Sequence, residues 1–392
     1  MVHYDYLIVG AGMTADAAVQ GIRKLDAQGS IALIGKEADP PYNRPDLSKG
    51  LWKGKLIDAI WQKTAAMSVE LLLGRSVASI DPQNHTARDD QGNIYSYKKL
   101  LLATGGTPRR LPFGEGNIIY FQTLNDYRRL REMCGHGKHF AIIGGGFIGS
   151  EIAAALAMNG EKVSLVFPEE GIGARIFPRQ LSLFLNDTYR EKGVQVLAGE
   201  HVKDLQKSKD SFILITDHGL QIPADSLVAG IGILPNIELA RSAGLQVGSG
   251  IVVDEMLRTT QPDIFAAGDV AEFYQPALGR HMRVEHEDNA NKMGKQAGRN
   301  MAGAGEAYQH LPFFYSDLFD LGYEAVGELD SRMETFEDWK EPYKEGVIYY
   351  LDGGRVRGVL LWNVWGALAA ARALIADPGP FKAANLKNRL GS

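Results

Sequence analysis

The residues near the start of the chain that could bind a phosphate form the pattern Gly10-x-Gly12-x-x-Ala15. The pattern follows the apolar run Tyr6–Val9 and precedes a stretch that predicts a helix. The first glycine permits a tight turn, the second lets backbone amides approach a pyrophosphate, and the small third residue lets the helix pack closely. One such pattern is a weak signal, but its place between a strand and a helix strengthens it. We call residues 10–15 the first cradle.

A second stretch repeats this plan, with Gly144-x-Gly146-x-x-Gly149 after the apolar residues of "HFAIIG". The sequence "SEIAAALAMNG" predicts the following helix, and "EKVSLVF" predicts the next strand. Two such patterns roughly 130 residues apart form an internal repeat that chance glycines explain poorly. We call residues 144–149 the second cradle, and the two cradles together predict two bound dinucleotides.

An acidic residue follows the second strand of each repeat. Glu37 ends "SIALIGKE", and Glu169 lies two positions after Phe167. A carboxylate at this place can accept hydrogen bonds from an adenosine ribose, and it would repel the extra phosphate of NADPH. Arg175, a short loop further on, could instead pair with that phosphate. We weigh the nearer glutamate as dominant and expect NADH to be preferred over NADPH.

Two further strand ends carry polar residues beside glycine. "KKLLLATGGTPRR" predicts a buried strand that runs into a glycine turn with Thr104, and "TTQPDIFAAGDVAEF" repeats the strand-then-glycine plan. Asp269 in "AAGD" could accept hydrogen bonds from the hydroxyls of a ribityl chain, or it could cap the following helix. From this residue alone, the helix cap is the favoured interpretation.

The composition indicates a soluble globular protein of two or three domains. The chain has 392 residues, a mean hydropathy of -0.15 and a net charge of -5, which argues against a nucleic-acid partner. Arg128, Arg129 and Arg131 form only a local basic patch. No apolar run approaches the roughly 20 residues of a membrane helix, and the residues before Tyr6 lead us to expect no secretory signal. A cytoplasmic location is the default expectation.

The chain has a single cysteine, Cys134. It can therefore form no internal disulfide and no thiolate-rich metal site, and we expect no metal centre. Its place in the glycine-flanked sequence "CGHGK" predicts an inert or surface thiol.

Taken in order, "GxGxxA", "ATGGTPR", "GGGFIGSE", "GIGxxPN" and "AAGD" resemble the pyridine nucleotide-disulfide reductase superfamily of flavoproteins. "PPYNRPDLSKGLW", "RVEHEDNANKMGKQAGRNMAG" and "FYSDLFDLGYEAVGEL" point to its ferredoxin-reductase-like branch, and "LVFPEEG", "GVIYYL" and "GVLLWN" are most similar to the apoptosis-inducing factors. The resemblance covers nearly the whole chain. It departs at Asp330–Tyr343, which is short where that group carries a long insertion.

The resemblance implies an α/β fold with two doubly wound, Rossmann-like dinucleotide-binding domains and a smaller α+β C-terminal domain. Residues 1–112 and 236–308 would form a discontinuous FAD-binding domain, 113–235 the NAD(P)H-binding domain, and 309–392 the C-terminal domain. FAD would lie at the first cradle and NADH at the second, so that a hydride passes from nicotinamide to flavin.

The resemblance also implies Lys49 and Glu151 as catalytic residues. In the family, the lysine of "RPxLSK" reaches the flavin near N5 and pairs with the glutamate that follows the second cradle. Hydride arrival makes the isoalloxazine anionic, and a nearby ammonium stabilises that charge. Without the resemblance, a solvated lysine and a glutamate placed by its helix N-terminus would be the better interpretation.

Other residues match family positions that contact the cofactors. The guanidinium groups of Arg44 and Arg109 suit the phosphates of FAD. Glu285 and His286 match a segment that lies along the flavin mainly through its backbone, and Tyr315 matches an aromatic beside the flavin or nicotinamide. The remaining predicted cofactor contacts are Val77, Ala103, Thr104, Gly105, Phe147, Ile148, Gly232, Asp269, Glu324 and Asn363.

Disulfide reductases of this superfamily carry a CxxxxC pair where this chain has "YNRPDLSKG", so no thiol can relay electrons here. Reduced flavin must therefore pass electrons to an external acceptor, either a ferredoxin-type protein or a small oxidant. The alternative is a redox-gated interaction protein, in which reduction by NADH gives a long-lived complex and changes dimerisation. A monomer and a homodimer both remain open.

Overall fold

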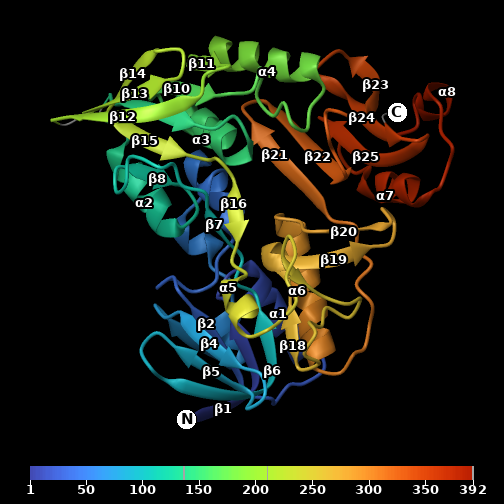
Figure 1. Ribbon diagram of the computed structural model, residues 1–392. Helices are drawn as coiled ribbons and strands as arrows, with labels where there is room; N and C mark the ends of the chain where they lie inside the picture. Colours follow the sequence, from blue (N-terminus) through green and yellow to red (C-terminus); the bar gives the residue numbers. More distant parts are fainter. Residues whose placement is uncertain (136, 210, 391–392) are drawn as a thin grey trace. The chain divides into compact units, whose positions relative to one another are not determined.

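The computed structural model describes residues 1–135, 137–209 and 211–390, and their contacts divide the chain into two compact units (Figure 1). Unit 1 comprises Met1–Arg44, Leu56–Thr107 and Leu234–Pro312. Unit 2 comprises Pro45–Lys55, Pro108–Ile233 and the chain from Phe313 onward. Among the described residues, no helix is both long and apolar enough to cross a lipid bilayer.

The core of unit 1 is a mostly parallel sheet. Its strands are β1 (Val2–Val9), β2 (Ile31–Gly35), β3 (Val69–Leu73), β4 (Val77–Asp81), β5 (Thr86–Asp89), β6 (Ile94–Leu102) and β18 (Ile264–Ala266). Their order is β3-β2-β1-β6-β5-β4, and β18 adds in parallel beside β6. Leu7 and Ile8 of β1 are fully buried, as expected for a central parallel strand covered on both faces.

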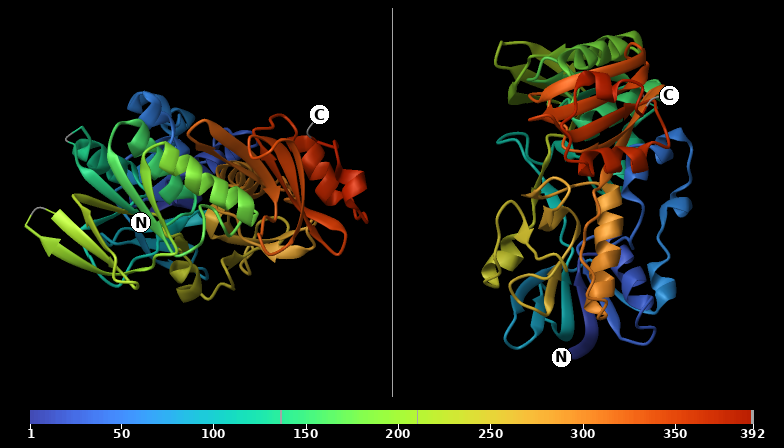
Figure 2. Two further views of the ribbon diagram at one scale, coloured as in Figure 1. Left: turned by 90° about the horizontal axis from the view of Figure 1, so that it is seen from above. Right: turned by 90° about the vertical axis from the view of Figure 1, so that its right-hand side faces the viewer.

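Two helices of unit 1, α1 (Met13–Arg23) and α6 (Glu287–Met301), pack through glycines of α6, the long orange helix of Figure 2. A side-chain carbon on Gly294 would lie 2.4 Å from the carbonyl oxygen of Thr14. One on Gly298 would lie 2.0 Å from that of Ala18. Glycine is therefore needed at both positions by the close approach of the α1 backbone.

The remaining elements of unit 1 are short. A small sheet contains β17 (Ile251–Val252), β19 (Ala271–Gln275) and β20 (Arg280–Met282). The helical turns are η3 (Ile57–Ile60), η4 (Thr64–Met67), α5 (Glu238–Ser242) and η5 (Gly268–Val270). The chain passes between the units within β7 (Gly106–Pro108) and β16 (Ile233–Pro235).

Unit 2 contains a second parallel sheet that repeats the strand–turn–helix plan. Its strands are β8 (Ile118–Tyr120), β9 (His139–Ile143), β10 (Lys162–Phe167), β11 (Val194–Ala198) and β15 (Ser226–Ala229), in the order β11-β10-β9-β15-β8. The helices are α2 (Leu124–Met133), α3 (Phe147–Met158) and α4 (Arg179–Glu191). An antiparallel sheet of β12 (Val202–Ser208), β13 (Ser211–Thr216) and β14 (Gln221–Ala224) follows β11 in the chain.

The C-terminal part of unit 2 is an antiparallel sheet in the order β21-β22-β25-β24-β23, with two helices after it (Figure 1). The elements are β21 (Phe313–Leu318), β22 (Leu321–Gly327), β23 (Glu334–Glu341), β24 (Glu345–Asp352), β25 (Arg355–Trp362), α7 (Leu368–Ala376) and α8 (Ala383–Leu386). Its core is aromatic: the rings of Tyr323 and Trp362 stack with their centroids 5.7 Å apart. This is the smaller α+β part that the sequence predicts, while the exact domain boundaries stay a prediction.

Residues 45–55, the strap segment, belong to unit 2 although unit 1 flanks them in sequence. The strap consists of two 3₁₀ turns, η1 (Arg44–Leu47) and η2 (Gly50–Lys53). The Trp52 indole N–H donates to the Leu47 carbonyl at 2.7 Å, and Asn159 at the end of α3 donates to the Trp52 carbonyl at 3.3 Å. These bonds hold the strap, and Lys49 within it, against α3.

Candidate functional site

The first cradle lies in unit 1 between β1 and α1. Gly10 has φ +126°, a conformation that side chains rarely adopt. A side-chain carbon there would also lie 2.2 Å from the carbonyl oxygen of Ala103, at the end of β6. Gly10 is therefore fixed both by the turn and by the approach of the neighbouring strand.

Gly12, the N-cap residue of α1, borders open space. A side-chain carbon on it would meet no described atom within 4 Å, and no described side chain caps the helix. The first amides of α1 are therefore available to an anion, and the helix dipole favours one there. Ala15 is fully buried, as its predicted packing role requires. These features fit the pyrophosphate of FAD.

The second cradle, in unit 2, has the same geometry. Gly144 has φ +111°, and a side-chain carbon on it would lie 2.4 Å from the carbonyl oxygen of Gly230. One on Gly149 would lie 1.8 Å from the Gly144 carbonyl oxygen. Gly146, like Gly12, is an N-cap residue with open space around it and no capping side chain among the described residues. Both cradles therefore offer an uncapped helix N-terminus to a phosphate.

The apolar residues after the second cradle are exposed. Phe147 and Ile148, the first residues of α3, expose 36% and 37% of their surface. The Phe147 ring packs edge-on against Phe314 of β21, with centroids 5.5 Å apart. Exposed apolar side chains beside a phosphate-binding turn suit a ligand with both a charged and a flat apolar part, as a dinucleotide has.

Glu37 and Arg44 form one cluster in unit 1. The Arg44 guanidinium is 2.7 Å from Glu37 Oε1, and the Tyr42 hydroxyl donates to Glu37 Oε2 at 2.6 Å. The Arg44 guanidinium also lies over the Tyr42 ring, 5.0 Å from its centroid. The two predicted roles, ribose contact for Glu37 and phosphate contact for Arg44, stay predictions, and each would have to compete with this ion pair.

Asp269 lies among charged residues of unit 1. Burial of the carboxyl, together with the charge of Glu285, raises its pKa to about 6, although Arg44 and Arg283 oppose the shift. The helix cap favoured from sequence is wrong: the N-cap of η5 is Ala267, and Asp269 lies inside that turn. The residue is partly buried, and its predicted role toward a ribityl chain stays a prediction.

His286 begins α6 as its N-cap residue. Burial lowers the pKa of its imidazole to about 4, so the ring is neutral near pH 7. A neutral histidine agrees with the sequence-based interpretation, which assigns it no acid or base role. Its neighbour Glu285 is exposed and pairs with Arg283 at 2.6 Å.

Lys49 and Glu151 form a buried ion pair in unit 2. The Lys49 ammonium is 2.7 Å from Glu151 Oε1, and the two side chains expose only 14% and 3% of their surface. The ammonium also lies 5.3 Å from the ring centroid of Tyr315. The solvated lysine that the sequence alone favours is therefore not observed, while the catalytic role of the pair stays a prediction.

Glu169 and Arg175, the competing residues for nucleotide choice, contact each other. Arg175 Nη2 lies 2.8 Å from Glu169 Oε1. The arginine side chain is 85% exposed and that of the glutamate 27%. Because the glutamate offsets the arginine charge, the pair as a whole presents little attraction to a second phosphate.

The other predicted contacts lie in two backbone clusters. In unit 1, the Thr104 hydroxyl donates to the Asn236 carbonyl at 2.9 Å, and the Asn236 backbone N–H donates to Gly105. In unit 2, the exposed Arg109 donates its backbone N–H to the carbonyl of Gly232, which has φ +90°. Each cluster closes a glycine turn at a strand end.

Of three further predicted contacts, Val77 and Asn363 have structural contacts of their own, while Glu324 has a buried oxygen without a hydrogen bond among the described residues. Val77 begins β4 and packs against the unit 1 core. The Asn363 side chain accepts from the Gly322 N–H and donates to the Lys344 carbonyl, both at 2.7 Å, which explains its place at the end of β25. Burial raises the pKa of Glu324, whose Oε2 has no hydrogen-bond partner among the described residues.

Cys134 is not a reactive thiol. Burial, together with the charge of Glu161, raises its pKa to about 11, and its Sγ donates to the Leu130 carbonyl at 3.4 Å. The thiol is therefore protonated at neutral pH and takes no part in redox exchange as a nucleophile. This agrees with the inert role predicted from sequence.

Sequence reasoning missed three side chains that complete these clusters. Ser48 and Ser316 each donate to the Glu151 carboxylate at 2.6 Å. Arg283 donates to the Asp269 carbonyl at 2.8 Å. Arg283 lies in the same "RVEHED" stretch as the predicted residues Glu285 and His286, so its position could have identified it as a further candidate. Ser48 and Ser316 also lie directly beside predicted residues, Lys49 and Tyr315, but their meeting with Glu151 comes from the fold of unit 2.

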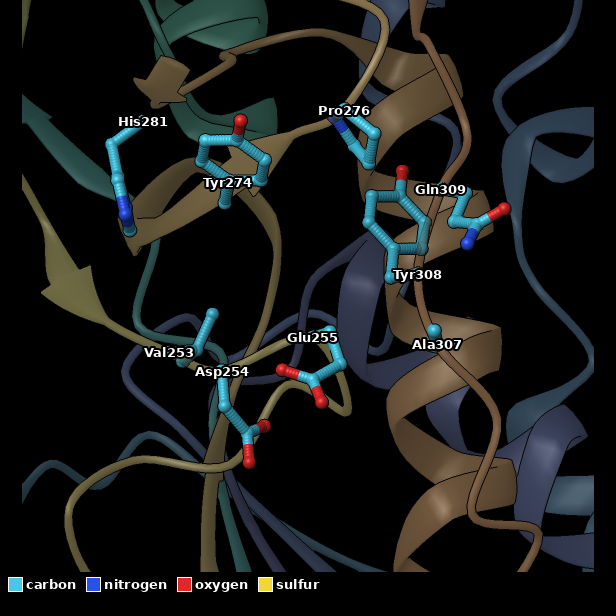
Figure 3. A pocket seen from close by; sticks show the side chains of 9 residues that line it. All are labelled: Val253, Asp254, Glu255, Tyr274, Pro276, His281, Ala307, Tyr308 and Gln309. Carbon is cyan, nitrogen blue, oxygen red and sulfur yellow. The ribbon is translucent and has the colours of Figure 1, made fainter. Parts of the chain in front are cut away.

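A separate hollow of about 350 Å³ lies in unit 1 (Figure 3). The Asp254 carboxylate at this hollow already pairs with Arg258 at 2.8 Å. The hollow contains none of the predicted site residues, and we assign it no function. Its lining residues are Val253, Asp254, Glu255, Tyr274, Pro276, His281, Ala307, Tyr308 and Gln309.

Two uncapped glycine cradles, each beside a parallel strand of its own sheet, define a fold that can bind two dinucleotides. A family model described as "Pyridine nucleotide-disulphide oxidoreductase" matches residues 4–294. The chain belongs to this family, whose cofactors are FAD and NAD(H). A second model, "Apoptosis-inducing factor, mitochondrion-associated, C-term", matches residues 297–341 and 336–377.

Curated relatives and solved structures agree with this assignment. Apoptosis-inducing factor 1, mitochondrial, of Dictyostelium discoideum is 34% identical, covering 95% of this chain and 78% of that protein. The anthranilate 1,2-dioxygenase system ferredoxin--NAD(+) reductase component of Burkholderia cepacia is also 34% identical, covering 95% and 94%. The covalent putidaredoxin reductase-putidaredoxin complex contains a chain that matches with a TM-score of 0.91 and 30% identity, covering 100% of this chain and 96% of that one. The predicted family and fold class are confirmed.

Proposed function

We propose that this chain is an NADH-dependent, FAD-containing reductase that passes electrons to a ferredoxin-type protein. The observation that carries the proposal is the pair of cradles, one in each unit, each with an open glycine at an uncapped helix N-terminus. Relatives along nearly the whole chain are ferredoxin--NAD(+) reductase components. Bound FAD would accept two electrons as a hydride from NADH and release them one at a time to the acceptor.

The test of this function is coupled electron transfer. The purified holoprotein, NADH, a ferredoxin-type iron-sulfur protein and cytochrome c are mixed, and cytochrome c reduction is followed. We expect reduction that requires all three earlier components. Equal rates with and without the iron-sulfur protein would reject it as the acceptor and favour a small oxidant.

Each cradle would bind the phosphates of one dinucleotide. In unit 1, the first cradle would bind the FAD phosphates, Arg44 would add positive charge, and Asp269 would accept hydrogen bonds from ribityl hydroxyls. In unit 2, the second cradle would bind the NADH phosphates, with Glu169 on the adenosine ribose. We take residues 1–112 and 236–308 as the FAD-binding domain, 113–235 as the NADH-binding domain and 309–392 as the C-terminal domain.

Lys49 would stabilise negative charge on the reduced flavin. Replacing it tests this role: Lys49→Ala should keep its FAD yet slow flavin reduction by NADH roughly tenfold or more, about 1.4 kcal/mol of activation free energy. Lys53→Ala is the matched control, because Lys53 lies in the same strap but is 48% exposed and pairs with Asp317. Stopped-flow reduction at the wild-type rate in Lys49→Ala would remove Lys49 from the reaction centre.

NADH should be preferred over NADPH. The Glu169 carboxylate would repel the 2'-phosphate and also holds Arg175 at 2.8 Å, so Glu169→Ala both removes repulsion and releases a cation. We expect Glu169→Ala to lower the ratio of flavin-reduction efficiencies with NADH and NADPH on the order of tenfold. The double variant Glu169→Ala/Arg175→Ala separates the two effects. Flavin-reduction efficiencies with the two nucleotides are the measurement, and a wild-type preference for NADPH would refute the assignment.

A second candidate function is a redox-sensing interaction protein. The observation that favours it is the match of residues 297–341 and 336–377 to the C-terminal model named for apoptosis-inducing factor. In this case reduced protein would reoxidise slowly, and its mass in solution would change from monomer to homodimer. Rapid reoxidation of the reduced protein by the ferredoxin-type protein, at constant mass, supports the reductase.

A cytoplasmic location stays a prediction.

A further inference from the structure

The Glu151 carboxylate joins three distant stretches of unit 2. Its Oε1 accepts from the Lys49 ammonium at 2.7 Å and from the Ser316 hydroxyl at 2.6 Å. Its Oε2 accepts from the Ser48 hydroxyl at 2.6 Å. Ser48 comes from the strap, Glu151 from α3 and Ser316 from β21, at sequence separations of 103 and 165 residues from the glutamate.

These bonds leave the carboxylate little freedom. Glu151 is 4% exposed, so an oxygen without a donor would be costly. Both serines are also buried, at 7% and 1% exposure. Because donors occupy both oxygens, the carboxylate cannot turn about its last bond without losing hydrogen bonds to a charged acceptor, which are stronger than neutral ones. The oxygen offered to Lys49 is therefore fixed in direction.

The charges around Glu151 leave Lys49 as the counter-ion. Burial raises the pKa of the phenols of Tyr189 in α4 and Tyr323 in β22, and the charge of Glu151 adds to both shifts. Both phenols are therefore neutral at ordinary pH. The ammonium of Lys49, 2.7 Å from Glu151 Oε1, balances the buried charge.

The residues on either side of Ser316 in β21 also contact the strap, although the Asp317–Lys53 pair is exposed on both sides and adds little to its stability. The Tyr315 ring lies 5.3 Å from the Lys49 ammonium, and Asp317 pairs with Lys53 at 3.2 Å. Three consecutive residues of β21 thus engage the strap or its glutamate partner.

We propose that Ser316 and Ser48 are positioning residues: their hydroxyls lock the Glu151 carboxylate and thereby hold the Lys49 ammonium in one orientation. The inference rests on the proposed function, because it concerns the action of Lys49 during flavin reduction. Neither hydroxyl is assigned a proton transfer. Both act through Glu151.

The test compares Ser316→Ala with Ser316→Thr, which keeps the hydroxyl. In stopped-flow reduction by NADH, we expect Ser316→Ala to lower the limiting rate about fivefold with an unchanged dissociation constant for NADH, and Ser316→Thr to recover most of the rate. Ser48→Ala should give a similar loss through the other oxygen. Ser164→Ala is the matched control, because this buried serine of β10 bonds His139 and Gln195 instead.

A second readout uses the FAD-free protein. Acetylation of Lys49 by acetic anhydride, followed by mass spectrometry, should be several times faster in Ser316→Ala than in wild type and in Ser164→Ala, because the ammonium is held less firmly. The proposal would be overturned if Ser316→Ala and Ser48→Ala showed the same acetylation rate of Lys49 and the same rate of flavin reduction as the wild-type protein. So would a rate loss in Ser164→Ala equal to that in Ser316→Ala, because the effect would then be general loosening.

The two proposals fail in different ways. If Lys49→Ala slows flavin reduction while both serine variants do not, the positioning role is wrong and the function of Lys49 stands. If Lys49→Ala also leaves the rate of flavin reduction unchanged, the proposed role of Lys49 is wrong, and the positioning role of the serines, which depends on it, is wrong as well. If Ser316→Ala does not fold, Ser48→Ala decides the question, because it removes the bond to Oε2 without altering β21.

Discussion

Gly12→Asp is expected to give a folded, colourless protein that contains no FAD. A side-chain carbon at this position meets no described atom within 4 Å, and the residue has φ -98°, which any residue adopts. The protein itself therefore tolerates the change. The new carboxylate would occupy the space in front of the first α1 amides and repel the pyrophosphate, lowering FAD affinity on the order of a hundredfold or more.

The measurement for Gly12→Asp is the ratio of flavin to protein absorbance after purification with added FAD. Circular dichroism confirms that the variant is folded. Gly12→Ala, which adds one methyl group and no charge, separates crowding from repulsion. A yellow Gly12→Asp protein with about one FAD per chain would contradict the assignment of the first cradle.

Gly146→Asp should produce the reciprocal result: full FAD content and almost no reduction by NADH. Gly146 has φ -84° and open space around it, so the substitution is again expected to leave the protein folded. A carboxylate at the N-terminus of α3 would repel the NADH phosphates, and we expect the efficiency of flavin reduction to fall on the order of a hundredfold or more.

Chemical reduction provides the control for Gly146→Asp. Dithionite needs no nucleotide site, so it should bleach the flavin of this variant as it does that of the wild-type protein. The two cradle variants also serve as controls for each other, because each should lose one dinucleotide and keep the other's machinery intact. Reduction of Gly146→Asp by NADH with wild-type efficiency would assign the nucleotide to another place.

The cradles could be predicted because their chemistry is local. A tight turn, an approaching phosphate and a packed helix all act within six residues, so spacing alone carries the information. The structure adds a cause that spacing does not contain. Gly10 and Gly144 are required also because the carbonyls of Ala103 and Gly230 come close from a neighbouring strand. These contacts join residues far apart in the chain.

The partners of the charged residues could not be predicted in the same way. Ser48 and Ser316 are ordinary polar residues whose meeting with Glu151 depends on the fold of unit 2, and no spacing in the sequence signals it. Glu37 likewise suits a ribose by its place after β2, yet it pairs with Arg44 and Tyr42. Residue type and spacing in the sequence identify candidate site residues. Tertiary contacts decide how far the charge of each side chain is neutralised by its neighbours.

Asp269 is a residue for which local sequence favoured the wrong interpretation. A short polar residue after glycine at a strand end is commonly a helix cap, and this made the cap the favoured interpretation. The backbone instead places the N-cap at Ala267 and puts the Asp269 carboxyl near Glu285, where its pKa rises to about 6. The charge of Glu285, which contributes to this raised pKa, comes from a separate stretch of chain.

The most direct test of the account is anaerobic mixing of the purified holoprotein with NADH while the visible absorbance of its flavin is followed. We predict a yellow protein with about one FAD per chain whose flavin absorbance is rapidly lost on mixing with stoichiometric NADH and returns when a ferredoxin-type acceptor is added. A folded protein that takes up no FAD, or a bound flavin that NADH leaves oxidised, would contradict the central claim.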